Sequence, residues 1–281
     1  MGRPDRGFVL LPLLLLSLAA CRDEAPRQPA AAAPAAPVPI ADVPAPREPV
    51  VLEDVVEAAP RYLIGISYPP AVNRYPGLAA ELKAYSDAAR QDLMDAVAAL
   101  DADAQGPLYD LSLEYTVLAD TPELFAVAAD GSSFTGGAHG APLIARFVWL
   151  PRQDRLLTVD ALIPDPEAWE GIASFAREQL HAALSQRVDA DELEPDDRAR
   201  VVRSAARMID EGASPEADSF SEFEPVLDDS RRLVALRFVF PPYQVGPYSD
   251  GVQTVEVPAA VLLPHVAPAY RALFSEAAAA Q

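Results

Sequence analysis

One short segment combines residue types suited to close backbone contacts and to proton exchange. It reads Phe-Thr-Gly-Gly-Ala-His-Gly over residues 134–140. Gly136 and Gly137 allow the backbone to adopt positive φ or to approach a ligand closely, and the ring of His139 can donate or accept hydrogen bonds. We therefore identify Gly136, Gly137 and His139 as candidate ligand-binding residues. The structural alternative is a tight crossing between strands in which His139 bonds a neighbouring carbonyl.

A second segment, residues 240–251, joins two apolar stretches and reads Phe-Pro-Pro-Tyr-Gln-Val-Gly-Pro-Tyr-Ser-Asp-Gly. Its prolines stiffen the chain, and Tyr243 and Tyr248 project from it. Aromatic side chains on a stiff loop bury contact area at a low cost in conformational entropy, which suits recognition. Tyr243 and Tyr248 are thus candidate ligand-binding residues. The alternative is that both tyrosines cover a sheet edge and bond locally.

The patterns of common catalytic and metal sites are missing. His181 and His265 lie at no metal-ligand spacing from each other or from His139. The chain has no Gly-x-Ser-x-Gly elbow, no phosphate-binding loop with lysine, and no Ser-x-x-Lys around Lys83, its only lysine. Acidic pairs are typical of solvated faces in so acidic a chain, although they leave a glycosidase pair open. We expect no cofactor, no metal and no enzyme; the alternative is a cell-wall hydrolase using His139.

The first residues have the pattern of a lipoprotein signal. Arg3 and Arg6 precede an apolar run, residues 8–20, which is shorter than the roughly 20 residues of a membrane-spanning helix. The run ends Leu-Ala-Ala-Cys at Cys21, the only cysteine. The sequence predicts a signal peptide at residues 1–20 and a lipid on Cys21 that anchors the chain to a membrane. Because aspartate does not directly follow Cys21, we expect the periplasmic face of the outer membrane rather than the inner one.

Composition narrows the class of partner. The formal net charge is −20, so the chain repels phosphate backbones and nucleic acid is not an expected partner. The same acidity suits a basic protein, although it also serves solubility alone. With its single cysteine lipidated, the chain would have no intramolecular disulfide, and an ordinary apolar core must stabilise it.

Apolar periodicity outlines the elements that must position the two segments. Residues 21–60, rich in alanine and proline, predict a disordered linker behind the lipidated cysteine. Alternating or apolar runs predict strands, and three- and four-residue spacing predicts helices. The expected strands are 62–68, 109–118, 125–129, 144–150, 155–159, 220–226, 233–240 and 251–257, with a loop at 130–133. The expected helices are 78–100, 165–187, 194–209 and a closing helix at 264–280.

These elements predict an α+β fold, with helices packed on one face of antiparallel sheets. We expect two modules, an N-terminal one at residues 61–135 and a C-terminal one at residues 136–276. The two candidate segments then lie at the start and near the end of the second module.

The two segments also carry a family resemblance. The pattern is Thr-Gly-Gly-Ala-His-Gly (135–140), an alternating strand with Trp149 and a helix, then Phe-x-x-Tyr-x-Val-x-Pro-Tyr-x-x-Gly (240–251) and a strand ending Val257-Pro258. It resembles the extracytoplasmic region of RsiV-type anti-sigma factors. It is also similar to the non-catalytic N-terminal part of PdaC-type peptidoglycan deacetylases. The likeness spans roughly residues 60–275, a region of unassigned function in most members.

The resemblance implies an α+β module of the bacterial envelope, which in the anti-sigma member binds lysozyme, a basic protein. The sequence shows neither a sigma-binding segment nor a deacetylase domain, so those activities are not carried over. The expectation is a non-catalytic binding module on a lipid tether, with a lysozyme-like basic protein or peptidoglycan as partner. A structural component of an envelope assembly is the other alternative.

Overall fold

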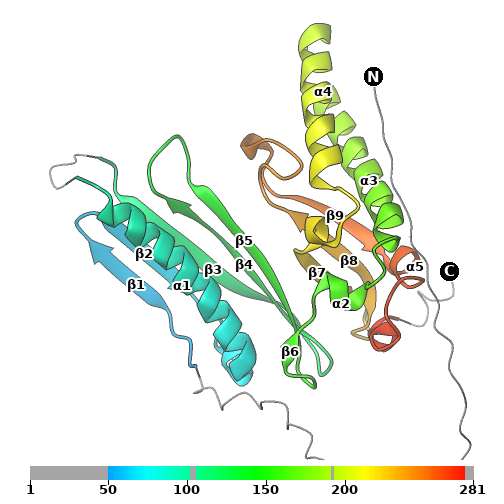
Figure 1. Ribbon diagram of the computed structural model, residues 1–281, viewed down its shortest axis with the longest axis horizontal. Coiled ribbons are helices and arrows are strands. Elements are labelled where there is room, and N and C mark those ends of the chain that lie inside the picture. The colour runs from blue at the N-terminus through cyan, green and yellow to red at the C-terminus, as the bar shows by residue number, and fades with distance from the viewer. Residues whose placement is uncertain (1–49, 102–105, 191–192, 276–281) are drawn as a thin grey trace, which may run out of the picture. The chain divides into compact units, whose positions relative to one another are not determined.

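The computed structural model describes residues 50–101, 106–190 and 193–275. Their strands form two sheets, six-stranded β1-β2-β3-β4-β5-β6 and three-stranded β7-β8-β9, with helices packed on each (Figure 1). This confirms the α+β class, and the sheets are antiparallel except for one parallel pair, β2 with β3. The strands are β1 (Val55–Ala59), β2 (Tyr62–Ser67), β3 (Tyr109–Asp120), β4 (Phe125–Phe134), β5 (Ala141–Leu150), β6 (Arg155–Leu156), β7 (Phe223–Leu227), β8 (Leu233–Phe240) and β9 (Gln253–Pro258).

The helices of the described chain lie between or after these strands. They are α1 (Pro76–Ala98), α2 (Val159–Leu162), α3 (Ala168–Ala190), α4 (Pro195–Gly212) and α5 (Ala259–Leu262). None of them is both long enough and apolar enough to cross a bilayer. The expected helices at 78–100, 165–187 and 194–209 are therefore confirmed as α1, α3 and α4, with ends shifted by a few residues.

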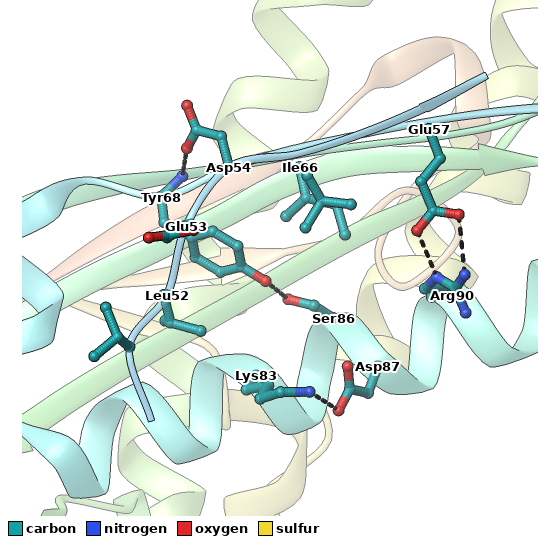
Figure 2. Close-up of a pocket in the computed structure, with 12 residues that line it drawn as sticks. Leu52, Glu53, Asp54, Glu57, Ile66, Tyr68, Lys83, Ser86, Asp87 and Arg90 are labelled. Atoms are coloured by element: carbon teal, nitrogen blue, oxygen red, sulfur yellow. Dashed lines mark hydrogen bonds and ion pairs between the residues drawn. The ribbon is translucent and has the colours of Figure 1, made fainter. Parts of the chain in front are cut away.

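Helix α1 covers one face of the six-stranded sheet and also explains its one parallel pair. β2 and β3 run parallel, while the other neighbours in this sheet are antiparallel. A parallel pair needs a long crossover, which α1 provides. Leu78, Leu82 and Leu93 are fully buried against the sheet. At the sheet edge, Arg90 of α1 bonds both carboxylate oxygens of Glu57 at 2.9 and 3.1 Å (Figure 2).

The first half of strand β4, residues 125–129, is buried on both faces. Phe125 and Val127 belong to the apolar cluster under α1, whereas Ala126, between them, belongs to a cluster shared with the second sheet. Strands buried on both faces read as continuous apolar runs, because neither face meets water. This explains why residues 125–129 show no polar alternation in the sequence.

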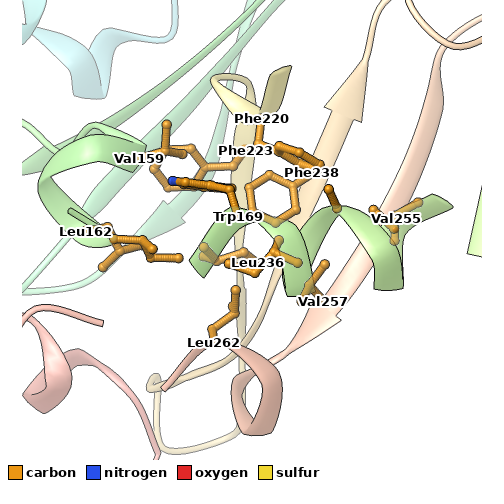
Figure 3. Packing of buried hydrophobic residues seen from close by; sticks show 14 of the residues in the cluster. Val159, Leu162, Trp169, Phe220, Phe223, Leu236, Phe238, Val255, Val257 and Leu262 are labelled. Atoms are coloured by element: carbon orange, nitrogen blue, oxygen red, sulfur yellow. The ribbon is translucent and has the colours of Figure 1, made fainter. Parts of the chain in front are cut away.

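The second sheet has an aromatic core of its own. Trp169 of α3 stacks on Phe220 at a centroid distance of 5.4 Å, and Phe238 of β8 meets both rings edge-on (Figure 3). Val148 and Leu150 of β5 belong to the same cluster. The two sheets therefore share apolar contacts within one compact unit.

Two expected boundaries are wrong. The linker expected to run to residue 60 includes β1, which pairs with β2 as a hairpin. Just before β1, the side chain of Asn73 bonds the main-chain oxygen and nitrogen of Leu52, at 3.0 and 2.8 Å. The module boundary expected at residue 135 falls inside the first sheet, because β5 pairs with β4. Apolar Val55 and Leu52 lie in a stretch rich in alanine and acidic residues, which hid this strand.

Two expected local structures are also wrong. Residues 130–133 continue β4 instead of forming a loop, because Gly131 allows a close approach to β3 rather than a turn. Of the closing helix expected at 264–280, the part up to residue 275 contains only a short 3-10 turn, Arg271–Leu273. Pro264 and Pro268 prevent a continuous helix there. Tyr270 and Phe274 are still buried, and the nitrogen of Ser275 bonds the carbonyl of Leu233.

Candidate functional site

The chain reverses between β4 and β5 at residues 135–140, and not at residues 130–133, where we expected a loop. Gly136 and Gly137 have φ angles of 103° and 97°. This region strongly favours glycine because a Cβ would clash with the backbone. His139 follows on the exposed side of the turn, and its Nδ1 lies 3.1 Å from the carbonyl oxygen of Gly140. The local bond expected under the structural alternative is therefore present.

The loop after β8, residues 241–251, is fixed to the body by Gln244. The side-chain amide of Gln244 donates to the carbonyls of Gly212 and Ser219, both at 2.9 Å. Gly212 ends α4, and a Cβ at that position would lie 1.9 Å from the carbonyl oxygen of Gln244. Val245 is buried beside this contact. Loop and helix end thus fit only because residue 212 has no side chain.

Tyr243 stands at the most strained point of this loop. Its φ of 75° is rare for a residue with a side chain, and such conformations cost on the order of 1–3 kcal/mol. The nitrogen of Tyr243 bonds the carbonyl of Gly246 at 2.9 Å, and Asp250 pairs with Arg187 of α3 at 2.6 Å. These anchors hold a strained backbone that presents the Tyr243 side chain outward, 53% exposed.

The structure brings three of the five predicted ligand-binding residues into one cluster, His139, Tyr243 and Tyr248, called here the aromatic cluster. The hydroxyl of Tyr243 lies 2.7 Å from Nε2 of His139. Tyr248 stacks on the His139 ring, with centroids 3.8 Å apart and planes 12° from parallel. The two tyrosine rings are 5.8 Å apart. Residues 104 positions apart in the chain therefore form one partly exposed surface, with Gly136 and Gly137 shaping its turn.

Contacts of His139 define what the cluster can do. Both ring nitrogens face neutral groups, the Gly140 carbonyl and the Tyr243 hydroxyl. A histidine acting as a general base is usually oriented by a third group such as a carboxylate. Among the described residues, no carboxylate contacts His139 by hydrogen bond or ion pair, and no group of three His, Cys, Asp or Glu side chains could hold a metal. The arrangement suits contact and stacking.

A charge network around the buried side chain of Arg146 links the two sheets. We did not predict this network from the sequence. Arg146 of β5 has a side chain only 7% exposed and pairs with Glu224 of β7 at 2.7 Å and with Asp130 of β4 at 2.9 Å. Its backbone nitrogen donates to the carboxylate of Glu222 at 2.5 Å. Burial raises the pKa of Glu222, and the bond from Arg146 opposes that rise. The available signal was an arginine within the apolar run at residues 144–150.

Cys21 lies outside the described residues. The other two histidines stand apart from the cluster: His181 pairs with Asp210 at the surface, at 3.1 Å.

The sequence analysis also missed Gln244, whose place between Tyr243 and Val245 gave no hint of its anchoring bonds. Only the packing against Gly212 reveals that role.

Comparison with known protein families finds one that matches part of the chain. The family described as "Protein of unknown function (DUF3298)" matches residues 169–260. A solved DUF3298 family member from Bacteroides fragilis is 16% identical, with a TM-score of 0.49, over 78% of this chain and 93% of that one. A DUF3298 family protein from Pseudomonas aeruginosa is 18% identical, with a TM-score of 0.47, over 79% and 95%. None of the curated proteins matches the chain. Residues 169–260, from α3 into α5, thus match DUF3298.

Proposed function

We propose that this chain is an envelope lipoprotein whose folded part is a non-catalytic binding module. The observation that carries the proposal is the aromatic cluster. Two loops, one shaped by glycines and one held by Gln244, converge to expose His139, Tyr243 and Tyr248 together. Fixed aromatic groups at a surface provide contact area without the entropy cost of ordering mobile side chains.

The partner is proposed to be a basic envelope protein of the lysozyme type, with peptidoglycan as the second ligand to test. The net charge of −20 favours association with a basic protein and raises its on-rate at low salt. The resemblance to RsiV-type and PdaC-type proteins supports an envelope role. The DUF3298 match falls within the same region of the chain and is consistent with that resemblance.

Anchoring is proposed to occur through a lipid on Cys21, at the periplasmic face and preferentially on the outer membrane. The support is the sequence pattern of residues 1–21. A Cys21→Ser variant should lose the lipid and leave the membrane fraction. If the variant fractionates with membranes as the wild type does, the anchoring proposal fails.

The binding proposal is tested by calorimetric titration of the compact unit, residues 48–281, at low salt. Lysozyme and soluble muropeptides are the two ligands. Tyr243→Ala should weaken binding at least about tenfold, as expected for an aromatic group central to an interface. Leu118→Ala is the matched control, because Leu118 is an exposed apolar residue of β3 that does not belong to the cluster. The proposal fails if neither ligand gives a heat of binding, or if Tyr243→Ala and Leu118→Ala bind equally well.

A further inference from the structure

A groove lies at one edge of the six-stranded sheet, between α1 and the segment that leads into β1. Its volume is about 470 Å³, within the range of about 300–1,000 Å³ typical of ligand sites. Figure 2 shows side chains of α1 on one side and those of β1 and its preceding segment on the other. We name it the edge groove. Its lining from the helix comes from Lys83, Ser86, Asp87 and Arg90.

Strand β1 leaves a free backbone edge beside this groove. It pairs with β2 alone, and among the described residues no other strand adjoins it. Ala59 faces Tyr62 across a two-residue turn, and the closing pair of such a turn is hydrogen-bonded. Pairs alternate along an antiparallel ladder, so the N–H and C=O groups of Val56 and Ala58 face the free edge. The Val56 side chain is 83% exposed.

The polar groups of the edge groove leave a local excess of negative charge. Lys83 pairs with Asp87 at 2.6 Å, and Arg90 pairs with Glu57. Glu53 and Asp54 also line the groove, and neither forms an ion pair with a described residue. Within the described part of the chain, Asp54 accepts only the backbone N–H of Tyr68, at 2.8 Å. A ligand that carries positive charge fits this balance.

We propose that the edge groove binds an extended peptide segment with basic side chains, which adds as a strand to β1. A strand added to a sheet edge gains main-chain hydrogen bonds from the free edge. Its alternate side chains would point toward the α1 layer, into the edge groove, where basic ones meet Glu53 and Asp54. This site shares no residue with the aromatic cluster, so it is a second contact surface, independent of the function proposed above.

The test uses the full chain and synthetic peptides of seven residues in which valine alternates with lysine. Peptides with glutamate in place of lysine serve as the charge control. Fluorescence anisotropy should show binding of the lysine series only. Val56→Pro removes the outward N–H and should weaken binding about tenfold, the effect of losing one hydrogen bond and its alignment. Val56→Ala keeps that N–H and should bind like the wild type.

Two further measurements keep the proposal open to refutation if Val56→Pro fails to fold. Glu53→Lys, at an exposed position, should weaken binding of the lysine series by a comparable factor. Lys83 is the only lysine of the chain, so acylation of its amine is located by mass spectrometry, and bound peptide should slow it several-fold. Equal binding of both peptide series, or unchanged acylation, overturns the proposal. So does a dimer in sedimentation that Val56→Pro disrupts, because β1 would then pair with a second copy.

Discussion

Two carboxyl groups illustrate how local surroundings set opposite responses to pH. Burial raises the pKa of Glu222 at the junction of the sheets. The hydrogen bonds from Arg90 lower the pKa of Glu57 at the edge of the first sheet. A group with a raised pKa stabilises the fold at low pH and loses that contribution as pH rises through its folded pKa; a lowered pKa does the reverse.

We therefore predict opposite pH slopes for Glu222→Gln and Glu57→Gln. Glutamine at 222 still accepts the Arg146 N–H, so this variant should gain stability relative to the wild type as pH rises from about 4 to about 7. Glu57→Gln should lose stability relative to the wild type as pH rises from about 3 to about 5, the window that a lowered pKa defines. The loss should stay below about 1 kcal/mol because the pair is partly exposed. Urea unfolding at several pH values measures both slopes. Parallel slopes would contradict the assigned causes.

At the scale of single elements, periodicity gave α1, α3, α4 and most strands, and β8 matches its expected bounds of 233–240. Periodicity depends on one face being buried and the other wet. It failed where that contrast is absent or very short, as for five-residue β1 in the expected linker. It also misplaced the turn at residues 130–133, because glycine serves close strand approach as well as turns. Whether a glycine forms a turn or allows close approach of a strand depends on a neighbour that is distant in the sequence.

Gly131 provides the test of this distinction. A Cβ there would lie 2.0 Å from the carbonyl oxygen of Ser112 on β3. Gly131→Ala should therefore cost more than about 2 kcal/mol, since forced overpacking displaces backbone. Gly65 of β2 is the matched control, because nothing lies within 4 Å of its added Cβ. Gly65→Ala should change the free energy of unfolding by less than about 0.5 kcal/mol. Similar losses in both variants, measured in urea, would refute the close-approach role.

The candidate site was predictable as residues but not as an assembly. Glycines, proline and tyrosines pointed to His139, Tyr243 and Tyr248 separately. Their contact depends on how β5 and β7 meet, and that is fixed by Arg146 and the shared apolar cluster. No periodicity encodes a pairing over about a hundred residues. The roles of Gln244 and Gly212 were hidden for the same reason.

Across the whole molecule, the shared cluster predicts that both sheets unfold together. The chain has two tryptophans, and each reports on one core: Trp149 lies under α1 and Trp169 in the second sheet's core. Trp169→Phe and Trp149→Phe leave one reporter each. Within each variant, the fluorescence transition in urea should coincide with the loss of helical circular dichroism. A fluorescence midpoint that differs from the circular-dichroism midpoint in the same variant would mean two independently folding modules.

The hold of Asn73 on Leu52 has a mechanical consequence. Any tension arriving along the backbone from the amino-terminal side reaches the compact unit at this point. The two bonds to Asn73 and the one between Asp54 and Tyr68 would stretch before the β1–β2 ladder does. Such tension would first displace the segment that forms one wall of the edge groove. The aromatic cluster lies on the loops after β4 and β8, farther from the point of loading. Tension would therefore change the edge groove before it changes the aromatic cluster.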